Sequence, residues 1–505
     1  MKNTSLWFRL RFLLLLLVGL SLGQTASAQV DYQPSGWPWT AQTNSGPDAQ
    51  VPGWFYNLGI TGLRIELVAN APKEMVVRYV IPGSPADGVI QVGAHVTGTG
   101  GANFLEPHQD GYGTDVFGAQ GPVGEFAAAL EAAQSATGNG KLRIRVTNGS
   151  TASVVLLNVG QTYGAFSPSY PESCPKSRLI LSELLEYLVI NQGANGSWGN
   201  PVNNLYASLA LLTSNKPAHQ AAAKSCAQNL ANTTAPTSNA SLVNWRFMTA
   251  GIVLSEYYLK TGEAWVLPEL TEVRDFLLDS QYTSHSQVDP NAQISHPHTY
   301  PNDPLDSFGG WGHNPGFEGY GPISMLTGEG ALVFALMERC GISVDQERHE
   351  WAYEFLARGT GNNGYLWYKD EVASNTNWAD HGRTGASGVA NWLSPYSDSH
   401  YHRDAIGHIV MIGENSQSFP DTHGSPILGM GFAAMATSFM PEQFRSLMDE
   451  NLWWFALAQC PDGSYYYQPN RDNAGYGADS RISASAVTAF MFSIPLRKLV
   501  VTGKP

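Results

Sequence analysis

The chain has 505 residues, a formal net charge of −14 and only 14% charged residues. This acidic balance argues against a nucleic-acid backbone or an anionic membrane surface as partner. It also disfavours a polyanionic substrate, unless a local basic pocket overrides the average. The length allows two or three domains. After the N-terminal leader no apolar run approaches the length of a membrane span, so we expect no integral membrane segment.

The first residues predict export. Lys2, Arg9 and Arg11 precede an apolar run from Leu13 to Leu22, and Ala26-Ser27-Ala28 forms a small-residue cleavage site. This order of basic, apolar and small residues is typical of a secretory signal peptide. We therefore predict a signal peptide over residues 1–28 and a mature chain that is periplasmic or extracellular.

A small β/α module is predicted over residues 53–159, after an extended lead-in over residues 29–52 that is rich in Pro, Gly, Ser and Asn. Alternating apolar residues predict strands over 63–68, 75–81, 142–146 and 153–157, and a helix over 123–134. Asn148-Gly149 predicts a hairpin turn between the last two strands.

Two runs in this module resemble bacterial PDZ domains. Tyr56-Asn-Leu-Gly-Ile-Thr-Gly62 is similar to their carboxylate-binding loop, and Val80-Ile-Pro-Gly-Ser-Pro-Ala-Asp-Gly-Val-Ile-Gln-Val-Gly93 is similar to their Gly-Ser-Pro-Ala signature. Ala94-His95 departs from the family, which usually has an Asp there. The resemblance implies that Leu58, Gly59 and Ile60 hold the C-terminus of a partner protein. A module that serves only as a spacer is the alternative.

An all-helical domain is predicted over residues 174–505, after a linker of Gly, Pro, Ser and Tyr over 160–173. Apolar residues at helical spacing indicate about a dozen helices, over 177–191, 202–214, 217–231, 242–260, 265–283, 322–340, 344–358, 383–393, 401–412, 426–438, 441–458 and 481–495. Gln192-x-x-x-Gly196-x-Trp198 recurs as Gln459-x-x-x-Gly463-x-Tyr465, with weaker echoes at Gly309-Gly310-Trp311 and Asn363-Gly364-Tyr365. We expect each glycine to end one helix and each aromatic to pack over the start of the next.

The recurring pattern resembles the repeats of α/α toroids, such as terpenoid cyclases and protein prenyltransferases. The resemblance implies an all-α toroid of about twelve helices, with long loops around a central cleft. The Asp-x-Asp-Asp motif of the class II terpene cyclases does not occur in the sequence, which argues against that activity.

Ten of the thirteen histidines lie between His285 and His423, mostly in predicted loops. Histidine carries protons near neutral pH, and aromatic faces stack on sugar rings. The candidate catalytic residues are His313, His381, Arg383, His402, Arg403, Asp421, His423 and Tyr467. The candidate substrate-stacking residues are Trp311, Tyr320 and Tyr476.

Three kinds of chemistry remain open from these residues. A polysaccharide lyase needs a His or Tyr base and neutralising cations, which this set contains. A glycoside hydrolase needs two carboxylates across the cleft, from Asp303, Asp306, Glu318, Asp380, Asp404 and Asp421. A divalent metal at His400, His402, Asp404, Asp421 and His423 fits no zinc spacing, so no cofactor is predicted. Cys174, Cys226, Cys340 and Cys460 form disulfides or stay free thiols.

The whole mature chain resembles an exported bacterial family that joins a PDZ-like domain to a helical domain of unknown function, family 6288. The residues that carry the likeness are Cys174-Pro-Lys-Ser177, Phe419-Pro-Asp-Thr-His-Gly-Ser-Pro426, Trp453-Trp-Phe-Ala-Leu-Ala-Gln-Cys-Pro-Asp-Gly463 and Tyr467-Gln-Pro-Asn-Arg-Asp-Asn-Ala-Gly-Tyr476. The resemblance implies the architecture and no known activity. The best hypothesis is an exported carbohydrate-active enzyme whose partner is a polysaccharide. The alternative is a non-catalytic scaffold that binds peptide termini.

Overall fold

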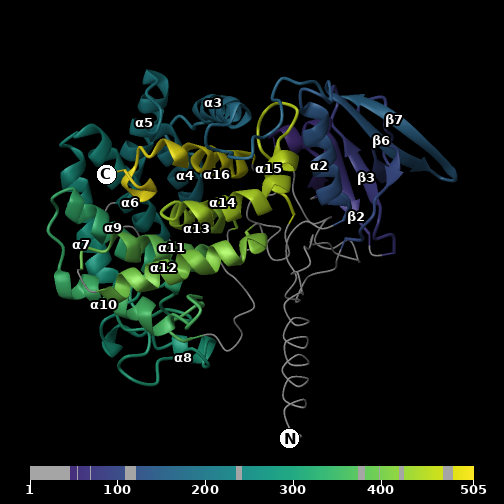
Figure 1. Ribbon diagram of the computed structural model, residues 1–505. Helices are drawn as coiled ribbons and strands as arrows, with labels where there is room; N and C mark the ends of the chain where they lie inside the picture. Colours follow the sequence, from purple (N-terminus) through teal and green to yellow (C-terminus); the bar gives the residue numbers. More distant parts are fainter. Residues whose placement is uncertain are drawn as a thin grey trace, which may run out of the picture.

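The computed structural model describes residues 46–53, 55–68, 70–108, 121–234, 241–372, 381–396, 399–419, 426–469 and 481–504. The predicted signal peptide lies outside these ranges. A small antiparallel sheet stands at one end of a larger helical domain (Figure 1). None of the described helices is both long and apolar enough to cross a membrane.

The N-terminal part, here called the β module, is an antiparallel sheet with one long helix, α2 (Pro122–Gln134), which contacts β4 and β6. The strand order is β1-β2-β3-β4-β6-β7, and β5 pairs with β4. The strands are β1 (Tyr56–Asn57), β2 (Leu63–Leu67), β3 (Met75–Val80), β4 (His95–Thr99), β5 (Ala102–Asn103), β6 (Lys141–Asn148) and β7 (Thr151–Asn158). These bounds confirm the predicted strands and helix. The hairpin prediction is also confirmed, because Asn148 pairs with Thr151 and Gly149 has φ +57°.

The helical domain is a closed ring of paired helices. The inner helices are α4 (Pro201–Leu212), α6 (Val243–Thr261), α9 (Ser324–Arg339), α11 (His381–Leu393), α13 (Pro426–Thr437) and α16 (Arg481–Ser493). Each contacts the next, and α16 contacts α4. The outer helices are α3 (Pro175–Ile190), α5 (Pro217–Thr233), α7 (Val266–Ser280), α10 (Gln346–Gly359), α12 (Ser399–Glu414), α14 (Pro441–Glu450) and α15 (Leu452–Ala458), and a short α8 (Ala292–Ser295) lies in a loop. This alternation is that of an α/α toroid.

The single helix predicted over residues 441–458 is instead two, α14 and α15, which meet at Asn451. Its buried side-chain amide donates hydrogen bonds to the carbonyl oxygens of Leu447 (2.9 Å) and Ser416 (2.7 Å). The side chain thus satisfies carbonyl groups that the broken helix leaves without intrahelical partners, which makes the break tolerable. The four cysteines, whose state the sequence left open, are all buried free thiols.

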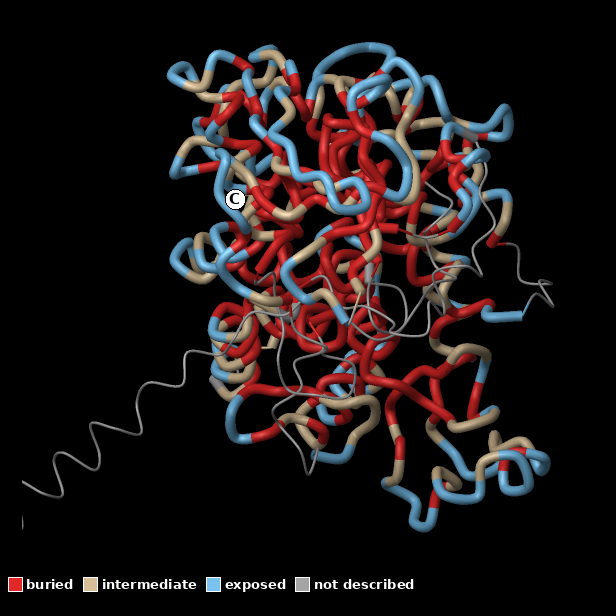
Figure 2. The backbone as a smooth tube through the Cα atoms, turned by 90° about the vertical axis from the view of Figure 1, so that its right-hand side faces the viewer, coloured by how far each residue is buried: buried red, intermediate tan, exposed pale blue. Residues whose placement is uncertain are grey.

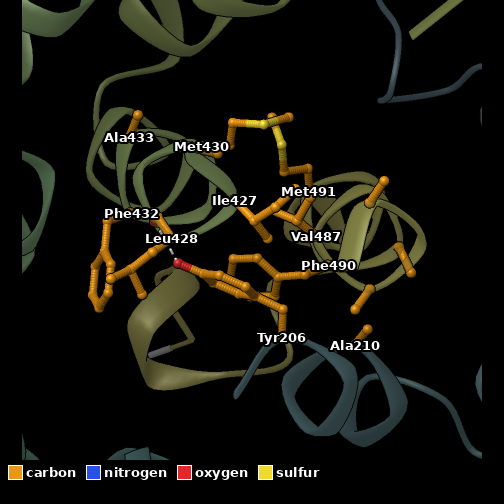
Figure 3. Close-up of a cluster of buried hydrophobic side chains, with 14 of the residues drawn as sticks. Tyr206, Ala210, Ile427, Leu428, Met430, Phe432, Ala433, Val487, Phe490 and Met491 are labelled. Carbon is orange, nitrogen blue, oxygen red and sulfur yellow. Dashed lines mark hydrogen bonds between the residues drawn. The ribbon is translucent and has the colours of Figure 1, made fainter. Parts of the chain in front are cut away.

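The inside of the ring is packed mainly with apolar side chains, and Tyr206 is buried among them. The Tyr206 hydroxyl of α4 donates a hydrogen bond to the carbonyl oxygen of Leu428 (2.7 Å), and its ring lies 5.4 Å from that of Phe490 (Figure 3). A Cβ on Gly431 would lie 2.1 Å from Cζ of Tyr206, so the glycine makes room for the ring. Buried backbone fills the centre of the domain, and exposed loops surround it (Figure 2).

Three of the four recurring glycines lie against the backbone of the next outer helix of the ring, whereas a Cβ on Gly463 would meet only side-chain atoms, at 3.2 Å or more. Gly196, Gly309 and Gly364 have φ of +85°, +87° and +80°. A Cβ on any of them would meet backbone atoms of Ser225 in α5, Trp351 in α10 or Gly407 in α12, at 2.2–2.4 Å. Positive φ and close backbone approach both require glycine.

The aromatic residues of the repeat contact both neighbouring helices. The indole Nε1 of Trp198 donates to the carbonyl oxygen of Leu188 near the end of α3, and that of Trp311 donates to Leu277 in α7, both at 2.8 Å. The predicted contact with the next helix is also present at Trp311, whose backbone N–H donates to Thr327 in the first turn of α9 (3.1 Å) and whose ring faces Gly330. The bond to the preceding helix was not predicted, and it forms because helix C-terminal carbonyls lack intrahelical donors.

We expect Gly309→Ala to lower the free energy of unfolding more than Gly341→Ala. Both residues have positive φ, which costs about 1–2 kcal/mol for a residue with a Cβ. Only Gly309 also faces backbone at 2.4 Å, whereas nothing lies within 4 Å of a Cβ on Gly341. Urea unfolding of the two variants measures the difference, and equal losses would contradict the proposed close contact.

Candidate functional site

The N-terminal ends of the six inner helices meet at one end of the ring, here called the mouth. Inner and outer helices alternate along the chain and run antiparallel, so every connection into an inner helix arrives at this end. The longest described connection, residues 281–323, precedes α9. Helix N-termini carry partial positive charge, which favours anionic groups at the mouth.

A chain of polar aromatic side chains crosses the mouth. The Trp245 indole at the start of α6 donates to Nδ1 of His313 (2.8 Å), and Nε2 of His313 is hydrogen-bonded to the Tyr320 hydroxyl. The hydroxyl of Tyr368 donates to that same Tyr320 oxygen (2.8 Å). All four side chains are half-buried.

The partners of His313 fix its tautomer. An indole N–H is only a donor, so Nδ1 of His313 must accept and the proton of the neutral ring sits on Nε2. Burial lowers the pKa of His313, although the carboxylate of Glu318 opposes this shift. The neutral imidazole therefore donates to Tyr320, whose oxygen receives a second hydrogen bond from Tyr368. Negative charge on the Tyr320 oxygen is stabilised by both donors.

The guanidinium of Arg383 places a positive charge beside this hydrogen-bonded series of side chains. Its guanidinium lies 4.8 Å from the ring centres of both Trp367 and Tyr368, in cation–π contact. Arg383 stands in the first turn of α11, at the mouth. His296 adds another ring, 5.4 Å from that of Tyr320. The mouth thus combines aromatic faces, a neutral histidine and an arginine.

The predicted catalytic and stacking residues do not all gather at the mouth. His313, Tyr320, His381 and Arg383 lie there, although His381 and Arg383 are buried. Trp311 is fully buried and packs against α9, so it offers no open face to a sugar. Asp421, His423 and Tyr476 lie outside the described residues.

His402 and Arg403 belong to the opposite end of the ring. They are exposed residues in the first turn of the outer helix α12. The His402 ring lies 4.8 Å from that of Trp392, in the last turn of α11. An outer helix runs opposite to its inner neighbour, so its first turn is far from the mouth. The sequence could not show this, because the residue type alone does not distinguish an outer helix from an inner one.

The described carboxylates of the hydrolase hypothesis do not face one another as a pair across the mouth. Asp303 and Asp306 are bonded to backbone N–H groups within their own loop. Glu318 is exposed and accepts from Asn314, and Asp404 lies on the outer helix α12. Asp380 lies outside the described residues. Over the described ranges, no group of His, Cys, Asp and Glu side chains is arranged to hold a metal ion.

Trp245 and Tyr368 were not among the residues predicted from the sequence. Trp245 stands near the start of an inner helix, and Tyr368 follows the loop glycine Gly364 by four positions. In a toroid both positions fall at the mouth. The available signal was their place beside an inner-helix start and in a connection that leads into an inner helix.

The loop predicted to hold a peptide terminus is closed by the chain itself. Leu58, Gly59 and Ile60 are buried, and the η2 turn (Gly59–Thr61) contacts α15. A Cβ on Gly59 would lie 2.8 Å from the carbonyl oxygen of Ala456. This loop is not open to a peptide in the structure, so the expected peptide-binding role has no accessible groove here.

At the same interface the side chain of Gln468 is hydrogen-bonded to the backbone of Asn57 in β1. The side-chain amide of Gln468 accepts from the backbone N–H of Asn57 (2.9 Å) and donates to the carbonyl oxygen of Asn57 (3.0 Å). Gln468 therefore occupies hydrogen-bonding positions on β1 that a neighbouring strand would take. Tyr467, a predicted catalytic residue, is fully buried beside it. The loop that leads from α15 towards α16 is thereby fixed to the β module.

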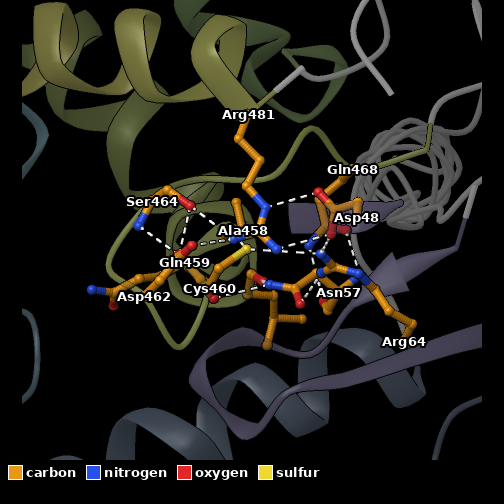
Figure 4. A network of polar contacts seen from close by, with 11 residues as sticks. Asp48, Asn57, Arg64, Ala458, Gln459, Cys460, Asp462, Ser464, Gln468 and Arg481 are labelled. Atoms are coloured by element: carbon orange, nitrogen blue, oxygen red, sulfur yellow. Dashed lines mark hydrogen bonds and ion pairs between the residues drawn. The ribbon is translucent and has the colours of Figure 1, made fainter. Parts of the chain in front are cut away.

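Asp48 is buried between two arginines, one from each domain (Figure 4). Its Oδ1 lies 2.8 Å from Nη2 of Arg64 in β2, and its Oδ2 lies 2.8 Å from Nε of Arg481 at the start of α16. Arg481 also bonds Asp462 (2.6 Å), and the Arg64 guanidinium lies 3.7 Å from the ring centre of Tyr466. Burial raises the pKa of Asp48, but the hydrogen bonds and charges of the two arginines outweigh it and lower the pKa.

We expect Asp48→Asn to lower the free energy of unfolding by about 3–5 kcal/mol, because it leaves two buried arginines without their shared anion. Glu66→Gln, which breaks the outward-facing pair with Arg78, costs about 0–1 kcal/mol and is the control. The stabilisation by Asp48 is present above the ordinary carboxyl pKa and is lost as the pH falls through its lowered folded pKa. Urea unfolding at neutral pH checks the difference, and equal effects would refute it.

Glu329 is a buried carboxyl inside the ring. Its neighbour Gly328 contacts α11 and Val333 contacts α6, so Glu329 faces the interior between them. Its Oε1 has no hydrogen-bond partner, and burial raises its pKa to about 8. Glu256 in α6 is equally buried, but its two oxygens accept backbone N–H groups of Val500 and Val501.

The raised pKa predicts a pH-dependent stability. Between the ordinary value of 4.5 and about 8, Glu329 is protonated in the folded chain and ionised in the unfolded chain. The free energy of unfolding therefore falls as the pH rises through this window, by up to about 1.4 kcal/mol per pH unit, and levels off above it. Glu329→Gln removes the part of this fall that Glu329 causes, while Glu256, whose pKa burial raises to about 7, still contributes its own part. Urea unfolding from pH 5 to pH 9 tests it; parallel curves for both proteins would contradict it.

The closed ring of paired inner and outer helices defines the helical domain as an α/α toroid. The chain belongs to the family described as a domain of unknown function, DUF6288, whose model matches residues 177–503. No curated protein sequence matches it.

Several solved structures resemble the helical part of the chain at low identity. An α-1,6-mannanase, GH76A of Salegentibacter sp. HEL1_6, is 13% identical, with a TM-score of 0.45 over 63% of this chain and 99% of that chain. A polysaccharide lyase is 11% identical, with a TM-score of 0.43 over 64% and 98%. A type II terpene cyclase from Scytonema is 12% identical, with a TM-score of 0.38 over 63% and 98%.

Proposed function

We propose that this chain is an exported carbohydrate-active enzyme that acts on a polysaccharide bound at the mouth of the toroid, most simply as a polysaccharide lyase. The observation that carries the proposal is the hydrogen-bonded chain from Trp245 through His313 to Tyr320 and Tyr368. It places a proton-transfer group among half-buried aromatic rings, which suit sugar faces. Export rests on the predicted signal peptide, and the mature chain is expected to begin at Gln29.

In this proposal Tyr320 acts as the base in its ionised, phenolate form. Its oxygen takes the proton next to the carboxyl of a uronate, the electrons form a carbon–carbon double bond, and the bond to the leaving sugar oxygen breaks. The Tyr320 hydroxyl then gives that proton to the leaving sugar oxygen, which restores the phenolate. His313 and Tyr368 stabilise the Tyr320 oxygen when it is charged, and Arg383 neutralises the charge that develops on the uronate carboxyl.

Two other functions have less support. A hydrolase needs two opposed carboxylates, and those described in the predicted set do not form such a pair at the mouth. A peptide-binding scaffold needs the loop at Leu58, Gly59 and Ile60 to be open, and the chain's own α15 covers it. The proton-transfer chain is a feature that neither of these functions explains.

We expect Tyr320→Phe to reduce turnover of a responsive uronate polysaccharide by about 10²–10⁴-fold, the usual effect of losing a general acid or base. Ultraviolet absorbance of the unsaturated product measures lyase turnover, and reducing ends alone indicate hydrolysis. Tyr396→Phe is the matched control, because Tyr396 donates only to the Gln346 carbonyl oxygen on an outer helix. Undiminished turnover in Tyr320→Phe would remove Tyr320 as the base.

A further inference from the structure

The β6–β7 hairpin carries an unpaired cationic face. Lys141, Arg143 and Arg145 alternate along β6, and their side chains lie on the face opposite the buried Leu142 and Ile144. Within the described part of the chain, none of the three has an ion-pair partner. No acidic residue occurs in either strand. This concentration of positive charge is unusual in a chain of net charge −14.

Two exposed apolar side chains run beside the cations. Val154 and Leu156 of β7 are 48% and 53% exposed, and they pair directly with Arg145 and Arg143. Cross-strand neighbours on one face lie about 5 Å apart, and alternate residues along a strand about 7 Å apart. The face is therefore a strip in which a row of cations lies next to a row of apolar groups.

The described acidic side chains on the rest of that sheet face do not neutralise the strip. Glu74, directly before β3, pairs with His95 of β4 at 2.7 Å. Glu66 of β2 pairs with Arg78 of β3. Both acids are therefore engaged with their own basic partners. The helix α2 contacts β4 and β6, while β6 and β7 form the edge of the sheet farthest from the helical domain (Figure 1). The strip is open to a ligand of extended shape.

We propose that this strip, Lys141, Arg143, Arg145, Val154 and Leu156, is an accessory binding surface for an anionic glycan chain. Regularly spaced cations match regularly spaced carboxylates on a polymer, and the apolar row packs against the carbon faces of its sugar rings. This inference rests on the proposed function and gives it a substrate class. A surface that binds an anionic glycan keeps a uronate polysaccharide close to the mouth that acts on it.

The charge pattern also favours a glycan over other anions. Nucleic acid carries dense charge that the remainder of this acidic chain repels. An anionic membrane presents a broad plane, whereas the strip is one strand pair wide. A polysaccharide carries lower charge density, and this fits three cations flanked by apolar groups.

Binding of the full mature chain to polygalacturonate tests the proposal. Replacing all three cations (Lys141→Gln, Arg143→Gln and Arg145→Gln) is expected to weaken binding at low salt by at least about tenfold, which corresponds to about 1.4 kcal/mol. Replacing three cations elsewhere (Lys216→Gln, Lys224→Gln and Arg274→Gln) removes the same charge and is expected to leave binding within about twofold. Added salt is expected to weaken the wild-type complex.

Three results would overturn the proposal. The first is unchanged polygalacturonate binding in the hairpin variant, and the second is equal binding of a neutral mannan. The third is stronger binding to phosphatidylglycerol vesicles than to the glycan. Tyr320→Phe separates this proposal from the enzymatic one, because it is expected to retain polygalacturonate binding. If the wild-type chain binds without turnover, the enzyme proposal fails and the binding surface stands.

Discussion

The arrangement of the two domains depends on one buried carboxylate. Asp48 lies between Arg64 of the sheet and Arg481 of the last inner helix, with nitrogen–oxygen distances of 2.8 Å to each. Burying three charged side chains costs free energy unless each is paired with an opposite charge. The interface is therefore stable only when both domains are folded and in contact. The segment after α15 is held beside this ion cluster. Hydrogen bonds of Asn57 with Gln459 and Gln468 join it to β1. Because α16 belongs to the inner ring, the β module also fixes one wall of the mouth.

The sequence predicted the fold well because its signals are local. Apolar residues at helical spacing gave the helices, and Asn148-Gly149 gave the hairpin. The recurring glycines were also visible, since positive φ and close backbone contact at Gly309 or Gly364 tolerate no other residue. The hydrogen bonds from the indoles to the preceding helices were not visible in the sequence. They depend on which helix end has unsatisfied carbonyls, and that is a property of the assembled ring.

The site was predicted only in part, and for a different reason. His313 and Arg383 were found by residue type, but the same criterion selected His402 and Arg403 at the opposite end of the ring. Trp311 was predicted to stack on a sugar ring. It is instead part of the core, because its indole N–H donates a hydrogen bond to the end of α7. The loop at Leu58, Gly59 and Ile60 was predicted from its local pattern to hold a peptide terminus. The helix that covers this loop, α15, comes about 400 positions later in the sequence. Residue type and local pattern cannot report such distant contacts.

Ring closure places the two ends of the helical domain side by side, since α16 packs against both α3 and α4. The order of synthesis therefore matters. The β module and the first helices emerge early, but their partners, Gln468 and Arg481, lie 411 and 433 residues farther along. Until these appear, the strand edge of β1 and the face of α4 that packs against α16 have no cover. A chain built in this way gains from staying unfolded until it is complete.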